Sequence, residues 1–163
     1  MSPPGAAEAT VPAAGAATVA FELDGRRIEA NAGESILAAA RRHGVEIPHL
    51  CHRDGCRPDG NCRACVVEID GERALAPSCC RAPTPGMKVN ARGDRARAAQ
   101  RMVLELLLAD APAADRRADS ELRHWAQALG VAASRFAPRE QPPEDLSHPA
   151  IAVRLDACIQ CGR

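Results

Sequence analysis

The sequence predicts an α+β fold in which a small mixed sheet is crossed by one helix and followed by a short α-helical extension. Alternating apolar and polar runs that end in Gly-containing turns recur before residue 92, and this pattern is typical of strands. One helix-forming run interrupts them. Further along, the apolar residues return at helical spacing. We therefore expect the sheet domain over residues 18–92 and the helical extension over residues 93–136.

The sheet domain begins with a predicted hairpin and a helix. In residues 18–30, TVAFELDGRRIEA, apolar and polar residues alternate on both sides of Asp24-Gly25, a pair favoured in tight hairpin turns. Residues 34–44, ESILAAARRHG, follow with apolar residues on one helical face and Gly44 as the capping residue. These elements supply the first half of the predicted domain.

Two further strands are expected after a long loop. Residues 65–70, CVVEID, have strand character and lead into an Asp-Gly turn. The chain begins its return over residues 73–76, and a last short strand is predicted over residues 87–90, after a Pro-Gly pair. The order hairpin, helix, loop, strand, turn and strand is a β-grasp-like arrangement.

The extension is predicted to contain two helices and to end in a linker. Residues 92–110 form an amphipathic-to-apolar run, and a second helix is expected over residues 120–129. One face of the first helix is expected to carry Met102, Val103, Leu106 and Leu107. We expect this apolar surface to pack on another part of a complex. Residues 137–149 contain four prolines and are predicted to be a linker, and a short strand follows within residues 150–163.

Composition excludes several classes of protein. The 163 residues carry 21 basic and 21 acidic side chains, so no charge imbalance points to a nucleic acid. No apolar run approaches the roughly 20 residues of a membrane span. Residues 1–17 are rich in Ala, Pro and Gly, which predicts a disordered tail rather than a secretory signal. We therefore expect a cytoplasmic location, where clustered cysteines indicate metal or redox chemistry rather than disulfides.

The cysteines are the strongest functional signal. Six of the eight fall within residues 51–80. Four of them form the pattern C-x10-C-x2-C-x13-C, namely Cys51, Cys62, Cys65 and Cys79. A two-iron, two-sulfur cluster needs four thiolates, two for each iron. The C-x2-C pair of Cys62 and Cys65 is a compact turn that can reach one metal, and the other two would complete the set.

Two alternatives accompany this interpretation. A tetrahedral zinc site would use Cys51, Cys56, Cys62 and Cys65, but it leaves the return to Cys79 unexplained. A Rieske-like site would recruit His49 and His52, although four well-spaced cysteines already exist. In the two-iron interpretation Cys56 is an unligated thiol.

The fourth ligand is Cys79 or Cys80. Adjacent residues of an extended segment point in opposite directions, so only one of the two can face a cluster. The residues alone favour neither.

The segments IPHLCHRDGCRPDGNCRACVVEI and SCCRAPTPGMKV resemble the N-terminal [2Fe-2S] domain of complex I-type large iron–sulfur subunits. The likeness is greatest to the alpha subunit of NAD-dependent, molybdenum- or tungsten-containing formate dehydrogenase. The resemblance implies a ferredoxin-like β-grasp domain with a [2Fe-2S] cluster on Cys51, Cys62, Cys65 and Cys79. Cys79 is favoured because the family places its fourth ligand seven residues before the Gly-Met pair that begins at Gly86.

The resemblance also implies a function and partners. The chain would relay single electrons from formate oxidation toward NAD, alongside other parts or subunits of the complex. The catalytic molybdenum domain would lie outside these 163 residues, so the chain by itself would not be an enzyme. The alternatives are the corresponding subunit of complex I or of a hydrogenase diaphorase, a free-standing ferredoxin, and a zinc-stabilised interaction module.

The chain departs from the family pattern in two places. Many relatives bind a second cluster through one histidine and three cysteines, but residues 81–157 contain no cysteine. His124 is therefore expected on the surface of the second helix. The final LDACIQCGR resembles the start of a ferredoxin-type [4Fe-4S] motif whose third cysteine would be residue 164. We expect a truncated motif, with Cys158 and Cys161 as free thiols, in a fragment or an early-ending gene product.

Overall fold

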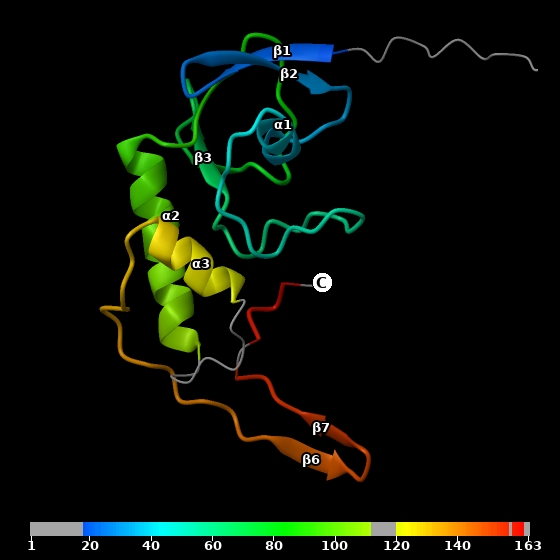
Figure 1. The fold of residues 1–163 in the computed structure, drawn as a ribbon, viewed down its shortest axis with the longest axis vertical. Coiled ribbons are helices and arrows are strands. Elements are labelled where there is room, and N and C mark those ends of the chain that lie inside the picture. Colours follow the sequence, from blue (N-terminus) through cyan, green and yellow to red (C-terminus); the bar gives the residue numbers. More distant parts are fainter. Residues whose placement is uncertain (1–17, 112–119, 157, 162–163) are drawn as a thin grey trace, which may run out of the picture.

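The computed structural model describes residues 18–111, 120–156 and 158–161 (Figure 1). The predicted tail over residues 1–17 lies outside the described residues. A five-stranded sheet has the order β2-β1-β5-β3-β4, in which β1 and β5 are parallel and the other neighbours are antiparallel. Its strands are β1 (Thr18–Leu23), β2 (Arg26–Asn31), β3 (Val66–Ile69), β4 (Ala76–Pro77) and β5 (Lys88–Asn90).

The first hairpin forms as predicted. β1 and β2 pair from Thr18↔Asn31 to Leu23↔Arg26. The turn residues Asp24 and Gly25 have φ values of 49° and 78°. A two-residue type I′ hairpin turn requires a positive φ at both of its central residues.

Helix α1 (Ile36–Arg42) packs its apolar face on this hairpin, as predicted. Ser35 caps it by accepting a hydrogen bond from the Ala38 N–H at 3.2 Å. The Leu37 N–H donates to the Ser78 carbonyl at 3.0 Å, and the Ile36 N–H donates to the Arg81 carbonyl at 2.8 Å. The first turn of α1 therefore fixes the segment that carries Cys79 and Cys80.

The two predicted helices of the extension are α2 (Asp94–Asp110) and α3 (Glu121–Ala128), which pack across each other below the sheet (Figure 1). Two members of the predicted apolar face of α2 are uncovered in this chain, as expected of a surface that packs on another part of a complex. Leu104 is fully buried, whereas Met102 and Leu106 are 39% and 46% exposed. The helix is apolar on more than one side, so its packing partners decide which residues are covered. His124 of α3 is exposed, as predicted.

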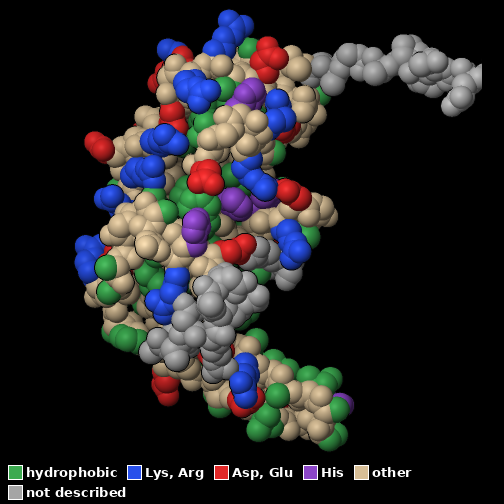
Figure 2. All heavy atoms as spheres, viewed as in Figure 1, with side chains coloured by type: hydrophobic (Ala, Val, Ile, Leu, Met, Phe, Trp, Pro, Cys, Tyr) green, Lys and Arg blue, Asp and Glu red, His purple; other side chains and the backbone are tan. Residues whose placement is uncertain are grey.

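The end of the described chain contains a second, two-stranded sheet. Strands β6 (Asp145–His148) and β7 (Ile151–Val153) pair as an antiparallel hairpin with exposed residues throughout. Its hydrophobic side chains lie on the projecting part of the surface in Figure 2. The predicted strand near residue 151 is confirmed. The predicted linker over residues 137–149 needs correction, because β6 occupies part of it and owes its order to pairing with β7.

The observed mixed sheet with few helices agrees with the predicted α+β class, and the more specific β-grasp assignment stays a prediction. Among the described helices, none has the length and apolar character needed to cross a membrane.

Candidate metal centre

The four predicted ligand cysteines are buried. Their exposed fractions are 6% for Cys51, 8% for Cys62, and 1% each for Cys65 and Cys79. All eight cysteines are free thiols, and the remaining four are exposed or half-buried. Burial therefore distinguishes the same four cysteines that the family resemblance implies as ligands, and none of them forms a disulfide.

The four thiols are arranged as two pairs. The Cys51 N–H donates a hydrogen bond to Cys62 Sγ at 3.5 Å. The side chains of Cys65 and Cys79 interact, and each shifts the pKa of the other. This differs from the predicted pairing of Cys62 with Cys65 on one metal. The contacts join each residue of the C-x2-C motif to a cysteine more distant in sequence, which spacing alone does not indicate.

The pairs alter the acidity of the sulfurs. The hydrogen bond from the Cys79 side chain lowers the pKa of the Cys65 thiol to about 6. The same contact raises the pKa of Cys79. Burial raises the pKa of Cys51. One thiolate is thus favoured within the Cys65–Cys79 pair, and the thiolate is the form that binds metal.

Left-handed backbone shapes the cysteine loop. Gly60 has a φ of 67°, a conformation that favours glycine, and a Cβ at this position would lie 3.0 Å from Cys80 Sγ, which would have to shift slightly. Arg63 has a φ of 57°, which is uncommon for a residue with a side chain. It lies between Cys62 and Cys65, whose sulfurs interact with Cys51 and Cys79, respectively.

The segment that holds Cys79 and Cys80 is a turn rather than a strand. The N–H groups of Cys80 and Arg81 both donate to the Pro77 carbonyl, at 3.1 and 3.2 Å. The argument that adjacent side chains point in opposite directions therefore fails here, and the two Sγ atoms lie 3.5 Å apart. Burial separates them instead, since Cys79 is 1% exposed and contacts Cys65 while Cys80 is an exposed residue.

The helical extension covers half of the centre. Cys65 and Cys79 belong to the core of the sheet and α1. Cys51 and Cys62 belong to a second core, which we call the helix core. Its buried members are Leu50, Cys51, Cys62, Ala64, Leu104 and Leu129, with Trp125 among the half-buried residues packed against them. The two cysteine pairs are therefore shared between two cores.

Two buried polar residues that sequence analysis did not identify hold this region together. Ser78 is fully buried, and its Oγ donates to the Cys65 carbonyl at 2.7 Å. Gln100 of α2 is also fully buried, and its Nε2 donates to the Val66 carbonyl at 2.9 Å, next to Cys65. A glutamine at an apolar position of a helix was the available signal, because a buried amide needs a partner.

The residues of the alternative sites are arranged differently. Cys56 of the zinc alternative is exposed. His49 Nδ1 lies 2.9 Å from the Ile47 carbonyl, and its ring packs 5.7 Å from that of Trp125. His52 is mostly buried, and burial lowers the pKa of its imidazole. Among the described residues, no three Cys, His, Asp or Glu side chains are grouped closely enough to hold one metal ion.

The final C-x2-C segment lies against the cysteine loop. Asn61 Nδ2 donates to the Gln160 carbonyl at 3.4 Å, and Ile159 and Cys161 pack on the helix core. Figure 1 shows this segment returning from β7 toward the loop. Cys158 is exposed and Cys161 is half-buried, and both are free thiols.

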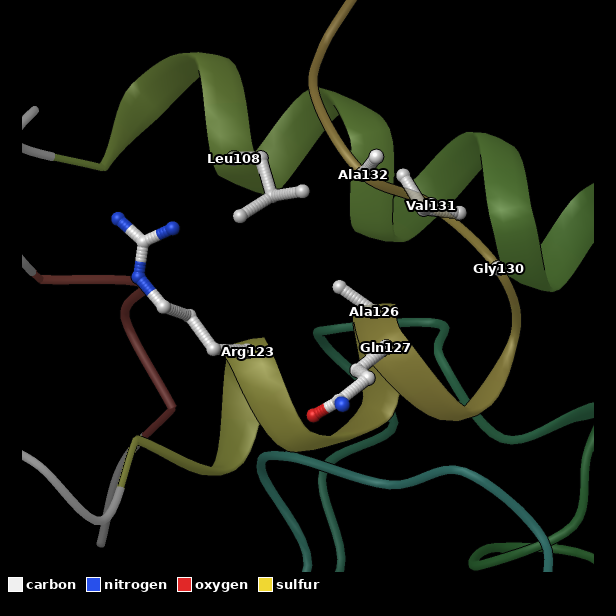
Figure 3. A pocket seen from close by; sticks show the side chains of 7 residues that line it. All are labelled: Leu108, Arg123, Ala126, Gln127, Gly130, Val131 and Ala132. Carbon is white, nitrogen blue, oxygen red and sulfur yellow. The ribbon is translucent and has the colours of Figure 1, made fainter.

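A pocket of about 420 Å³ lies elsewhere, between α2 and α3 (Figure 3). Leu108 faces it from α2, and Arg123, Ala126 and Gln127 line it from α3. None of the eight cysteines lines this pocket, so it is separate from the candidate metal centre.

The donor set fits a two-iron cluster, because four buried thiols without disulfide bonds lie in two pairs and each iron takes two thiolates. Residues 16–93 match the family described as "2Fe-2S iron-sulfur cluster binding domain". This part of the chain is accordingly a 2Fe-2S cluster-binding domain.

The domain is related to subunits of NADH-quinone and NADH-ubiquinone oxidoreductases. The chain is 34% identical over 152 residues to an NADH-quinone oxidoreductase subunit of Rhizobium meliloti (strain 1021), covering 86% of this chain and 17% of that protein. It is 31% identical over 154 residues to the mitochondrial NADH-ubiquinone oxidoreductase 78 kDa subunit of Candida albicans, covering 90% and 21%. The chain thus spans about a fifth of the length of these curated relatives.

A solved structure with a similar fold is the NAD⁺-reducing [NiFe]-hydrogenase in the H2-reduced state. The match has a TM-score of 0.78 and 34% sequence identity, and it covers 90% of this chain and 64% of the hydrogenase chain.

Proposed function

We propose that Cys51, Cys62, Cys65 and Cys79 hold the [2Fe-2S] cluster, and that the chain transfers electrons one at a time. The observation that carries this proposal is the gathering of these four buried thiols into two pairs. Cys51 and Cys62 would bind one iron, and Cys65 and Cys79 the other. The bound cluster would accept and release one electron without making or breaking bonds to a substrate.

The surrounding residues prepare the site for an anionic cluster. The lowered pKa of Cys65 favours the thiolate that binds iron. The Cys51 N–H is directed at Cys62 Sγ and would stabilise negative charge on that sulfur. Leu104 and Leu129 exclude water from the Cys51–Cys62 side. Low solvent access and hydrogen bonds to sulfur are the factors through which a protein sets a cluster's potential.

For the parent complex we propose the alpha subunit of an NAD-dependent formate dehydrogenase, on the sequence resemblance described above. In that setting the chain would carry electrons from formate oxidation toward NAD and would have no catalytic activity alone. A complex I-type subunit or a hydrogenase diaphorase is the alternative, and the relatives named above favour it.

The position of Cys158 and Cys161 supports a relay with more than one centre. Their segment contacts Asn61, the residue next to Cys62. Two cysteines do not satisfy a four-iron cluster, which takes four. If further cysteines joined these two, a [4Fe-4S] cluster would lie beside the [2Fe-2S] site, and electrons would pass between adjacent centres.

The apolar side chains of α2 support assembly with other protein surfaces. Met102 and Leu106 are exposed on one side of the helix, and a pocket opens between α2 and α3. Exposed apolar surface of this kind marks contact sites. We propose that other parts or subunits of the oxidoreductase cover it.

The cluster assignment is tested on the 163-residue chain purified without oxygen. Iron and acid-labile sulfide analysis should give two of each per chain, with an EPR signal after dithionite reduction. Single Cys→Ser changes at the four proposed ligands should lower the iron content and the signal. Cys56→Ser is the matched control and should leave both unchanged. Full iron content in Cys79→Ser would contradict the assignment of the fourth ligand, and a colourless zinc-containing protein would contradict the cluster.

The parent reaction is tested on the intact complex isolated with this chain. Anaerobic addition of formate should produce the EPR signal of the reduced [2Fe-2S] cluster, whereas hydrogen should not. Reduction by hydrogen or NADH with no response to formate would replace formate dehydrogenase with the diaphorase or complex I-type alternative.

A further inference from the structure

The Cys80 thiol contacts a proposed cluster ligand although it is not one itself. Its Sγ lies 3.5 Å from Cys79 Sγ, and either sulfur can be the donor in the free thiol pair. It also donates to the Pro58 carbonyl at 3.6 Å. The thiol therefore lies between the cysteine loop and the Cys79 sulfur.

The backbone fixes the thiol in this position. The turn hydrogen bond from the Cys80 N–H to the Pro77 carbonyl sets the direction of the side chain. The loop approaches it at Gly60, where even one added carbon would lie 3.0 Å from Cys80 Sγ. The 3.5 Å contact with Cys79 is thus held from two sides of the site.

We propose that Cys80 is a positioning residue that donates an S–H···S hydrogen bond to Cys79 and raises the midpoint potential of the cluster. The inference rests on the proposed cluster. A coordinated Cys79 has lost its proton, so Cys80 is then the only possible donor in this contact. The negatively charged ligand sulfur accepts such a bond more strongly than the Pro58 carbonyl does.

The direction of the effect follows from charge. Reduction adds one negative charge to the cluster and its ligand sulfurs, so a donor at Cys79 stabilises the reduced state more than the oxidised state. Removing the donor should lower the midpoint potential while leaving all four ligands in place. Cys80 is an exposed residue, so its thiol proton should also exchange readily with deuterium.

The test compares Cys80→Val with Cys80→Ser in EPR-monitored redox titrations of the 163-residue chain. Valine has a similar size and no donor, whereas serine keeps a donor. Cys56→Val is the matched control, because Cys56 is also an exposed loop thiol. We expect two irons per chain in every variant, a lower midpoint potential in Cys80→Val, a higher value in Cys80→Ser than in Cys80→Val, and no shift in Cys56→Val.

A second readout is the Fe–S(Cys) stretching region of the resonance Raman spectrum. Transfer to D2O should shift a band of the wild-type chain that does not shift in Cys80→Val. An intact two-iron signal with equal potentials and equal deuterium response in wild type and Cys80→Val would overturn the role of Cys80 alone. Absence of a two-iron signal from the wild-type chain would overturn the cluster, and this inference with it.

Discussion

Leu104 is expected to control how tightly the protein retains its cluster. It is fully buried in α2 and belongs to the helix core that contains Cys51 and Cys62. A Leu→Ala change at such a site costs about 2–5 kcal/mol, through lost apolar burial and the cavity that remains. If this core must open before iron is lost, even about 2 kcal/mol raises the rate of loss about thirtyfold.

The assay follows bleaching of the visible absorbance at a fixed urea concentration without oxygen. A rate is the suitable quantity because loss of the cluster is irreversible. Leu106→Ala is the matched control, since it makes the same change on the same helix at a residue that is 46% exposed. It should alter stability by no more than about 0.5 kcal/mol. Equal bleaching rates for Leu104→Ala and Leu106→Ala would refute the idea that α2 protects the cluster.

Three further predictions concern the same region. Ser78→Ala should lower the free energy of unfolding by about 1 kcal/mol, seen as a lower thermal midpoint, because it removes the hydrogen bond to the Cys65 carbonyl; an unchanged midpoint would count against it. The hydrogen bonds from Arg135 hold the pKa of Glu105 below its ordinary 4.5. The ionised Glu105 therefore stabilises the fold fully above pH 4.5, and this stabilisation is lost as pH falls through the lower pKa of the folded state. The free energy of unfolding measured in urea should therefore fall more steeply from about pH 5 to about pH 3 in wild type than in Glu105→Gln. Parallel plots of this free energy against pH would contradict the prediction. The ligand thiols are 1–8% exposed, so removing iron with a chelator should make them reactive toward a maleimide once mild urea opens the cores; no gain in labelled thiols over the iron-loaded chain in the same urea would argue against their ligation.

The parts of the fold that sequence analysis predicted are those that local chemistry determines. Asp24-Gly25 specifies a hairpin turn wherever two strands flank it, and Ser35 caps a helix through its own hydroxyl. Of the four buried cysteines, Cys51, Cys62 and Cys65 follow from the spacing, whereas the choice of Cys79 over the exposed Cys80 came from the family resemblance.

The features that sequence analysis missed depend on contacts between distant residues. Cys62 interacts with Cys51 rather than with Cys65, and this contact joins residues that are 11 apart in the sequence. Which leucines of α2 are buried depends on where α3 and the cysteine loop meet it. Strand β6 has the sequence DLSH, which carries little strand preference of its own and forms through pairing with β7.

The division of the two cysteine pairs between two cores has a consequence for the timing of cofactor insertion. Residues 18–92 contain all four proposed ligands, but the cover over Cys51 and Cys62 comes from Leu104 and Leu129. During synthesis, the ligands would leave the ribosome well before the residues that shield them. A cluster delivered at that moment would be exposed to solvent and oxygen on one side. We therefore expect stable insertion to wait until the chain has emerged beyond Leu129 and α2 and α3 have closed on the loop.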